Sequence, residues 1–192
     1  MTTYIDVFVR LTRQMNGAVS QTMRELGGDQ GMKYKMNYGV SLPTIKDIAL
    51  EYYPNHALAE DLWRQEVREM QLAAVYIDQP EEITFEQIDK HSQKWEHIEI
   101  GQVAAMHLLW KTPIALQIAQ KWFNSPNRAQ HIASCHIIGK IAPITQSADL
   151  LQFITPEANA YAMREVYKYH TELRAQIKCI APKIEDLEWQ LE

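Results

Sequence analysis

Apolar residues recur every three to four positions along most of the chain, the spacing of one buried face on an amphipathic helix. Over residues 4–25 this stripe comprises Ile5, Phe8, Leu11, Met15, Val19 and Met23, which predicts one long helix. The glycine-rich stretch at 27–31 (GGDQG) is expected to end it. Ser41 and Pro43 then predict a new helix start, as N-cap and first-turn residue, and Pro54 is expected to stop that helix.

The same spacing continues to the end of the sequence. Further helices are predicted within HALAEDLWRQ, VREMQLAAVYIDQ, TFEQIDKHSQ, KWEHIEIGQVAAMHLLW, TPIALQIAQKWF and SPNRAQHIASCHIIGKIA, and from about residue 157 to 180. No alternating run of β-branched residues predicts a strand, so the fold class is expected to be all-α. Short polar connections favour stacked antiparallel helix pairs, either a solenoid of HEAT or armadillo type with roughly 40 residues per repeat or an irregular bundle.

Composition adds that the chain is an ordinary globular protein. Its 192 residues are 46% hydrophobic and 22% charged, which predicts one helical domain over residues 1–192. No apolar run is long enough to span a bilayer and the first residues do not form a secretion signal, so a cytoplasmic protein is expected. Cys135 and Cys179 both fall in helical apolar patterns, which favours buried free thiols over a disulfide or a metal pair.

Charge is unevenly distributed. The net charge of −5 argues against a general nucleic-acid binder, and residues 47–99 carry thirteen acidic side chains against four basic ones. Residues 100–150 reverse this balance. Their charged side chains are Lys111, Lys121, Arg128 and Lys140, against Asp149 alone. A local patch rather than the overall charge decides binding, so an anionic partner stays possible.

One helix start is unusually rich in functional side chains. The run KWEHIE brings Trp95, Glu96, His97 and Glu99 together just before a segment, Val103 to Trp110, that is apolar on every side. If the helix already includes Trp95, then Trp95 and Glu99, four residues apart, share one face. Carboxylates are also favoured in any first helical turn by the macrodipole, and Trp95 could simply pack under the preceding loop. The pattern therefore leaves a site and a capped helix end both open.

Residues 36–141 resemble the bacterial DNA alkylation repair family, the HEAT-like glycosylases that excise cationic alkylpurines. The segment YGVSLPTIK (38–46) matches that family's YGV-x-x-P turn, and Leu62-Trp63 with Glu69, Gln71 and Ala74 matches its next helix pair. The run Trp95-Glu96-His97-Ile98-Glu99 matches a tryptophan–aspartate run at a helix start. The resemblance implies a solenoid of HEAT-like helix pairs whose concave face can hold duplex DNA.

The resemblance also assigns roles. It implies that Glu99 stabilises the positive charge that builds on the sugar as the base leaves, with Trp95 as an aromatic wall for the cationic base. The residues expected to contact the substrate are Glu96, His97, Lys111, Lys121, Arg128, His131 and Lys140. No cofactor or metal is expected. The sequence departs from the family in having Glu99 where active members have aspartate, and Gln130 or His131 where they have arginine.

Two functions follow as alternatives. One is a glycosylase that releases N3- or N7-alkylpurines from duplex DNA, and the other is a non-catalytic HEAT-like scaffold that binds DNA or protein.

The other histidines and tryptophans have simpler interpretations. His131 and His136 lie five residues apart, which does not suit two metal ligands on one helix face, and His107 is expected to be a hydrogen-bonded core residue. Trp63, Trp110 and Trp122 lie on apolar stripes and are expected in the core.

Overall fold

The computed structural model describes residues 3–25, 34–145 and 147–150, and these residues form helices and no strand. The helices are α1 (Tyr4–Thr12), α2 (Gly17–Glu25), α3 (Leu42–Leu50), α4 (His56–Trp63), α5 (Arg68–Ile77), α6 (Phe85–Ser92), α7 (Ile98–His107), α8 (Ala115–Trp122), α9 (Arg128–Ile141) and α10 (Ser147–Leu150). Two short 3-10 turns, η2 (Pro80–Glu82) and η3 (Leu109–Lys111), join α5 to α6 and α7 to α8. The all-α prediction is confirmed for this part of the chain. The predicted GGDQG stop, the helix expected near 157–180 and Cys179 lie outside the described residues.

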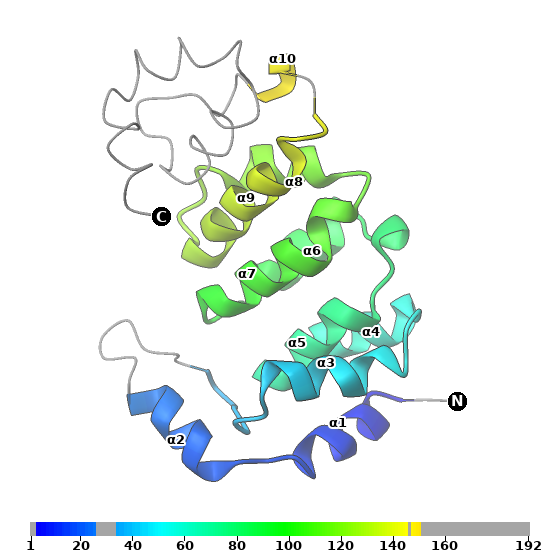
Figure 1. Cartoon of the computed structure of the whole chain (residues 1–192), viewed down its shortest axis with the longest axis vertical. Coiled ribbons are helices and arrows are strands. Elements are labelled where there is room, and N and C mark those ends of the chain that lie inside the picture. Colours follow the sequence, from blue (N-terminus) through cyan, green and yellow to red (C-terminus); the bar gives the residue numbers. More distant parts are fainter. Residues whose placement is uncertain (1–2, 26–33, 146, 151–192) are drawn as a thin grey trace.

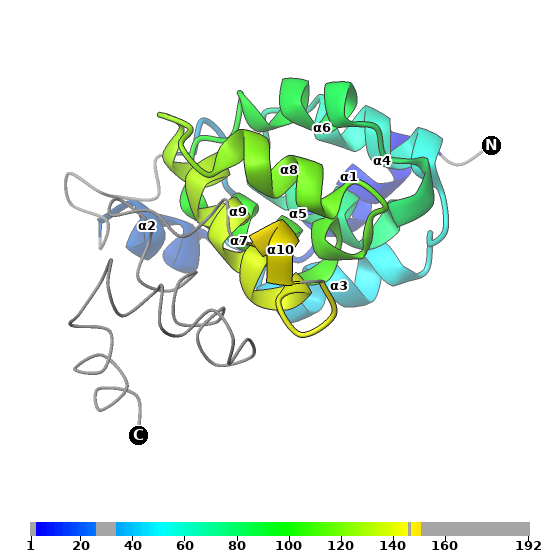
Figure 2. The same cartoon turned by 90° about the horizontal axis from the view of Figure 1, so that it is seen from above.

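The helices stack in two layers. Along one layer α3 packs on α5, α5 on α7 and α7 on α9, while α4 packs on α5 and α8 on α9 from the other layer (Figure 1). Seen from above, α4 and α6 lie together on one side and α3, α7 and α9 toward the other (Figure 2). Helix α5 contacts α3, α4 and α7 and is buried along its whole length. Consecutive antiparallel pairs stacked in this way form an open series rather than the closed core of a four-helix bundle.

The predicted long helix over residues 4–25 is two helices in the structure. The chain leaves the helix after Thr12 and restarts at Gly17, with Asn16 Oδ1 accepting from the backbone N–H of Val19. At this break the N–H of Asn16 donates to the carbonyl of Tyr38 at 2.9 Å, a long-range bond that an uninterrupted helix could not make. The apolar stripe correctly predicts helix in this region. The break between α1 and α2 lies where the chain contacts the segment at 37–40.

Gly39 explains why that segment needs its glycine. Its φ of 72° lies in the left-handed region, and a Cβ there would lie 2.3 Å from the carbonyl oxygen of Asn16. The next helix begins as predicted, because the Ser41 hydroxyl accepts from the N–H of Thr44 and Pro43 lies in the first turn of α3. The YGV turn is therefore a close backbone crossing followed by a capped helix.

Helix α7 is shorter than the pattern predicted. It begins at Ile98, with His97 as its N-cap, and ends at His107. Trp95 and Glu96 therefore precede the helix, so the prediction that Trp95 and Glu99 share a helix face is wrong. The apolar run beyond Val103 is not buried on every side either, because Met106 is exposed and Trp110 is only partly buried in the turn that follows.

Candidate functional site

Glu99 is held by a cation from the neighbouring helix. Arg68, the first residue of α5, donates from Nε to Glu99 Oε2 at 2.8 Å and from Nη2 to Oε1 at 2.6 Å, a bidentate pair. The Tyr34 hydroxyl donates to Oε2 at 2.6 Å. Both carboxylate oxygens thus have partners inside the protein, and the Glu99 side chain is only 17% exposed.

Arg68 serves a second carboxylate at the same time. Its Nη1 donates to Glu69 Oε1 at 3.1 Å and to the Val40 carbonyl at 2.9 Å. Glu69 is fully buried and also accepts from the N–H groups of Tyr38 and Val40, at 3.2 and 3.3 Å. Arg68 and Glu69 therefore tie the YGV turn to the start of α5, and Glu99 joins α7 to the same network.

This network fixes the charge states. Burial alone would raise the pKa of Glu99, but the hydrogen bonds and positive charge of Arg68, with the hydrogen bond from Tyr34, outweigh it and hold that pKa below its usual value. Burial and the adjacent Glu99 charge raise the pKa of the Tyr34 hydroxyl far above its usual value. Glu99 is thus an anion and Tyr34 a neutral donor at neutral pH.

Glu96 and His97 hold the chain in front of α7. Glu96 accepts from the backbone N–H of Lys35, and His97 Nδ1 accepts from the N–H of Glu99 at 3.1 Å. The rings of Tyr34 and His97 lie 5.6 Å apart. Burial, followed by the nearby charges of Arg128 and Arg68, keeps the pKa of His97 below its usual value, so that its Nδ1 stays free to accept. Both side chains therefore have hydrogen-bond partners inside the protein. Their contact with a substrate stays a prediction.

Trp95 lies in the core instead of on the surface. Its side chain is 5% exposed and packs 6.0 Å from the ring of Trp63 and 5.6 Å, edge to face, from that of Trp122. Its indole N–H has no hydrogen-bond partner among the described residues. An aromatic wall for a cationic base must be reachable, so this geometry does not give Trp95 that position. Trp63 and Trp122 are buried as predicted, whereas Trp110 is partly buried.

The start of α9 also differs from the family pattern that the resemblance implied. Gln130, where that pattern has arginine, points inward and donates to Ser92 Oγ at 2.6 Å. His131 is paired through Nδ1 with the carbonyl of Phe123, and its Nε2 lies 3.9 Å from the sulfur of Cys135, which is buried and free as predicted. Arg128 is exposed, and its charge reaches His97. The arginine beside Glu99 is Arg68, which comes from the preceding helix pair.

The predicted basic residues do not form one row. Burial lowers the pKa of His107, and the charges of Lys46 of α3, Lys111 and Lys140 lower it further. Lys46 and Lys111 also line one cavity together with His107. Within the described part of the chain, none of these three lysines forms an ion pair. Lys121 is exposed at the end of α8, in the other layer. We call Lys46, His107, Lys111 and Lys140 the basic cluster.

Two members of the basic cluster were missed by the sequence reasoning. Lys46 lies beside Ile45 in an apolar helix stripe and was matched only as part of the YGV turn motif, and His107 lies in an apolar run, so the sequence assigned neither a binding role. His107 is half-buried, has no hydrogen-bond partner among the described residues and lies 5.2 Å, ring centre to ring centre, from Tyr76. The expectation of a hydrogen-bonded core histidine is therefore wrong. Its spacing of four residues from Lys111 was the signal available.

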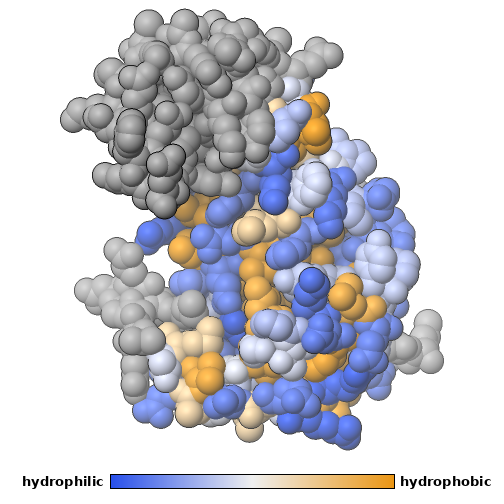
Figure 3. Space-filling view, in the orientation of Figure 1, coloured by the Kyte–Doolittle hydropathy of each residue, from blue (hydrophilic) through white to orange (hydrophobic). Residues whose placement is uncertain are grey.

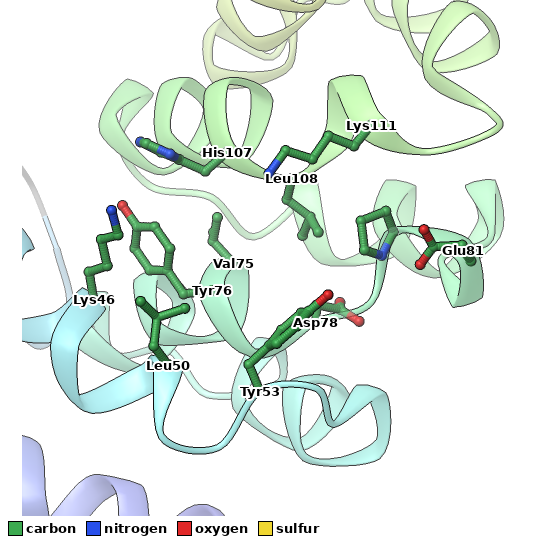
Figure 4. A pocket seen from close by; sticks show the side chains of 11 residues that line it. Lys46, Leu50, Tyr53, Val75, Tyr76, Asp78, Glu81, His107, Leu108 and Lys111 are labelled. Carbon is green, nitrogen blue, oxygen red and sulfur yellow. The ribbon is translucent and has the colours of Figure 1, made fainter.

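A cavity of about 390 Å³ opens beside the basic cluster. It is lined by Lys46, Leu50, Tyr53, Val75, Tyr76, Asp78, Pro80, Glu81, His107, Leu108 and Lys111. Figure 4 shows the amine of Lys46, the Tyr76 hydroxyl and the His107 ring at one end, and Glu81 at the other. On the face of the molecule that carries α3, α7 and α9, hydrophilic residues predominate and apolar residues form separate patches (Figure 3).

The described residues contain no cluster of three or more potential metal-ligating side chains. The search for membrane spans, made over the same residues, found no helix with the length and apolar character to cross a bilayer.

Comparison with known families decides what the chain is. The model of a family described as "DNA alkylation repair enzyme" matches residues 15–164, most of the chain. The chain belongs to this family. The match extends beyond the residues 36–141 on which the resemblance rested, and it includes the YGV turn, Arg68 and Glu99. Among curated proteins no similar sequence was found.

A solved structure shares the fold. It comes from work described as "A new family of proteins related to the HEAT-like repeat DNA glycosylases with affinity for branched DNA structures". Its TM-score is 0.74 at 17% sequence identity, over 95% of this chain and 83% of that one. At this identity the likeness establishes the HEAT-like helical fold, which confirms the predicted solenoid of helix pairs over the irregular bundle.

Proposed function

We propose that this member of the alkylation repair family binds DNA through the basic cluster and does not use Glu99 to excise bases. The observation that carries the proposal is that Lys46 of α3 and Lys111 of η3 line one cavity with His107, while the charge of Lys140 of α9 also acts on His107. Lysines without carboxylate partners are available to replace the counterions of a phosphate backbone. Of the thirteen acidic residues of 47–99, Asp78 and Glu81 line the cavity beside these lysines, and Asp78 is already paired with His56. A local surplus of lysines, rather than the net charge of −5, decides binding.

The branched DNA named for the structural relative is the substrate we carry over to this chain. A branch point presents phosphates from several strands within a small area, and the lysines of the basic cluster come from three separate elements, α3, η3 and α9. Duplex DNA is the simpler ligand and the natural comparison. Lys121 and Arg128 stay predicted contacts that lie away from the cluster.

Glu99 is the reason for separating binding from excision. A carboxylate stabilises a sugar cation through charge that is free to face it, whereas the charge of Glu99 is neutralised by two hydrogen bonds from Arg68. Turnover at Glu99 would require that pair to open. A glycosylase remains the second candidate, and one observation favours it: Glu99 is kept ionised, as a cation-stabilising carboxylate must be.

Binding is tested by fluorescence anisotropy with a labelled three-way junction and a linear duplex of equal length at low salt. We expect binding by the wild type and clear weakening in the variant Lys46→Gln/Lys111→Gln/Lys140→Gln. Lys90→Gln, an exposed lysine of α6 in the other layer, is the matched control. No binding by the wild type to either DNA would sink the proposal and favour a protein-binding scaffold.

Excision is tested separately by release of 7-methylguanine from methylated duplex DNA at high protein concentration. We expect no release by the wild type. Release that disappears in Glu99→Gln, in protein that still melts cooperatively, would instead establish the glycosylase and overturn the second half of the proposal.

A further inference from the structure

The cavity beside the basic cluster has the composition of a nucleotide site. Its volume of about 390 Å³ falls in the range of roughly 300–1,000 Å³ typical of small-ligand sites. Tyr53 and Leu50 are 51% and 46% exposed at its edge, although both are large and apolar. Tyr76, Val75 and Leu108 form buried parts of the lining. A flat aromatic ring placed there would cover the two exposed side chains.

The charges around the cavity are asymmetric. Lys46, His107 and Lys111 line it, with Lys46 and His107 at one end and Glu81 at the other (Figure 4). Asp78 also lines it, but its carboxylate is already satisfied by His56 at 2.6 Å, by the Trp63 indole at 3.0 Å and by the N–H of Gln79 at 2.9 Å. One end thus suits a phosphate, while the aromatic lining suits a base.

His107 fits such a site better than a structural role. Its imidazole has no hydrogen-bond partner among the described residues, and its ring lies beside that of Tyr76. A neutral imidazole offers one donor and one acceptor to a base edge, and its flat face offers a stacking surface. Lys111 also lines the cavity, and its amine lies 5.9 Å from the centre of the Trp110 ring, so it is a cation available beside the site without a carboxylate partner among the described residues.

We propose that this cavity receives one unpaired deoxynucleotide at a DNA branch point, with its base against Tyr53 and Tyr76 and its phosphate on Lys46 and Lys111. The inference rests on the proposed DNA binding and gives it a structural basis for preferring branches: a continuous duplex keeps its bases paired and stacked, whereas a junction leaves some of them free. The basic cluster supplies affinity for either DNA, and the cavity supplies the discrimination.

The test compares two three-way junctions with identical arms, one fully paired and one with a single unpaired adenine at the branch. Affinities are measured by anisotropy for the wild type, Tyr53→Ala and Leu50→Trp, which removes one wall and fills the entrance respectively. We expect about tenfold tighter binding of the junction with the unpaired adenine by the wild type, the effect of one stacked base. Both variants should lose this ratio and keep their affinity for the paired junction.

Tyr4→Ala, which removes an exposed tyrosine of α1 away from the cavity, should keep the ratio. Equal affinity of the wild type for the two junctions would overturn the inference and leave the proposed DNA binding standing, whereas no binding to either would refute the DNA binding itself. Free deoxyadenosine monophosphate is the last arm. Its binding, lost in Leu50→Trp and unaccompanied by any preference for the unpaired adenine, would assign the cavity to a free nucleotide and overturn the DNA assignment.

Discussion

Arg68 is the residue on which the charged network depends, since it is the common partner of two acidic side chains. Its own side chain is 4% exposed, that of Glu69 is fully buried and that of Glu99 is 17% exposed. A buried charge that loses its partner is strongly destabilising, while removal of one carboxylate leaves Arg68 paired with the other. Loss of the Arg68 guanidinium should therefore destabilise the network more than loss of the Glu99 carboxylate.

Arg68→Met should accordingly destabilise the protein more than Glu99→Gln. We expect about 3–5 kcal/mol for Arg68→Met, because Glu69 and Glu99 are both left without a cation. For Glu99→Gln we expect about 1–3 kcal/mol, since Arg68 keeps Glu69. Urea unfolding followed by circular dichroism measures both. An equal cost for the two variants would show that Glu69 does not depend on Arg68.

The lowered pKa of Glu99 gives a pH dependence with a definite sign. A carboxyl group whose pKa is lower in the folded than in the unfolded protein adds stability above its unfolded value, near 4.5, and loses it as pH falls through the folded value. Unfolding free energies of the wild type and Glu99→Gln should therefore differ most near neutral pH and converge as the pH falls below 4.5. A gap that stays constant over this range would mean that Glu99 is not selectively ionised by folding.

At the scale of elements, α7 is positioned by a backbone contact with α9. A Cβ added at Gly101 would lie 2.4 Å from the carbonyl oxygen of Ala129, so the two helices touch where the glycine has no side chain. The site on α7 inherits its position from this crossing and from the His97 cap one turn earlier. Glu99 lies between the two, which accounts for its fixed place opposite Arg68.

Gly101→Ala should disturb this crossing although alanine is the better helix former. Because the obstructing atom is backbone, α7 and α9 must move apart, and we expect a loss of about 1–3 kcal/mol. Gly17→Ala is the matched control: it meets nothing within 4 Å and should be neutral or stabilising by up to about 1 kcal/mol. Thermal unfolding distinguishes them, and similar melting temperatures for both would contradict the close crossing.

For the whole molecule, the decisive property is that a protein with a charge of −5 carries a local basic surface. The basic cluster takes Lys46 from α3, His107 from α7, Lys111 from η3 and Lys140 from α9. The elements α3, η3 and α9 therefore each supply one lysine to the cluster, and α7 supplies the neutral His107. The three lysines can bind one polyanion together only when α3, η3 and α9 are correctly stacked.

The salt dependence of binding should report the number of these lysines that reach phosphates. For duplex DNA each contact contributes about 0.9 to the slope of log K against log salt, so the triple lysine-to-glutamine variant should lower the slope by about 2–3. Titrations of the duplex at several salt concentrations measure the slope, with Lys90→Gln expected to leave it unchanged. An unchanged slope in the triple variant would place the DNA on another surface.

The sequence by itself determined the helical class, the stacked pairs and the family, because the apolar spacing that recurs in every helix and the single YGV turn at 38–40 are local patterns. The sequence also indicated Glu99 as a candidate site residue, but it did not indicate that Arg68 pairs with the Glu99 carboxylate. Arg68 lies thirty-one positions earlier in the chain and meets Glu99 only because α5 and α7 pack with their first turns adjacent.

Tertiary structure alone decided the rest. The sequence predicted Trp95 in the site, whereas in the structure its ring packs against those of Trp63 and Trp122. Lys46 and His107 are brought near each other only by the stacking of α3, α7 and α9. The predicted first helix is divided where Asn16 and Ser20 contact the segment at 37–39. The physical reason is the same in each case. Helix periodicity depends on residues three and four positions apart in the sequence, whereas a charged pair, a cavity or a break in a helix depends on contacts between residues far apart in the sequence.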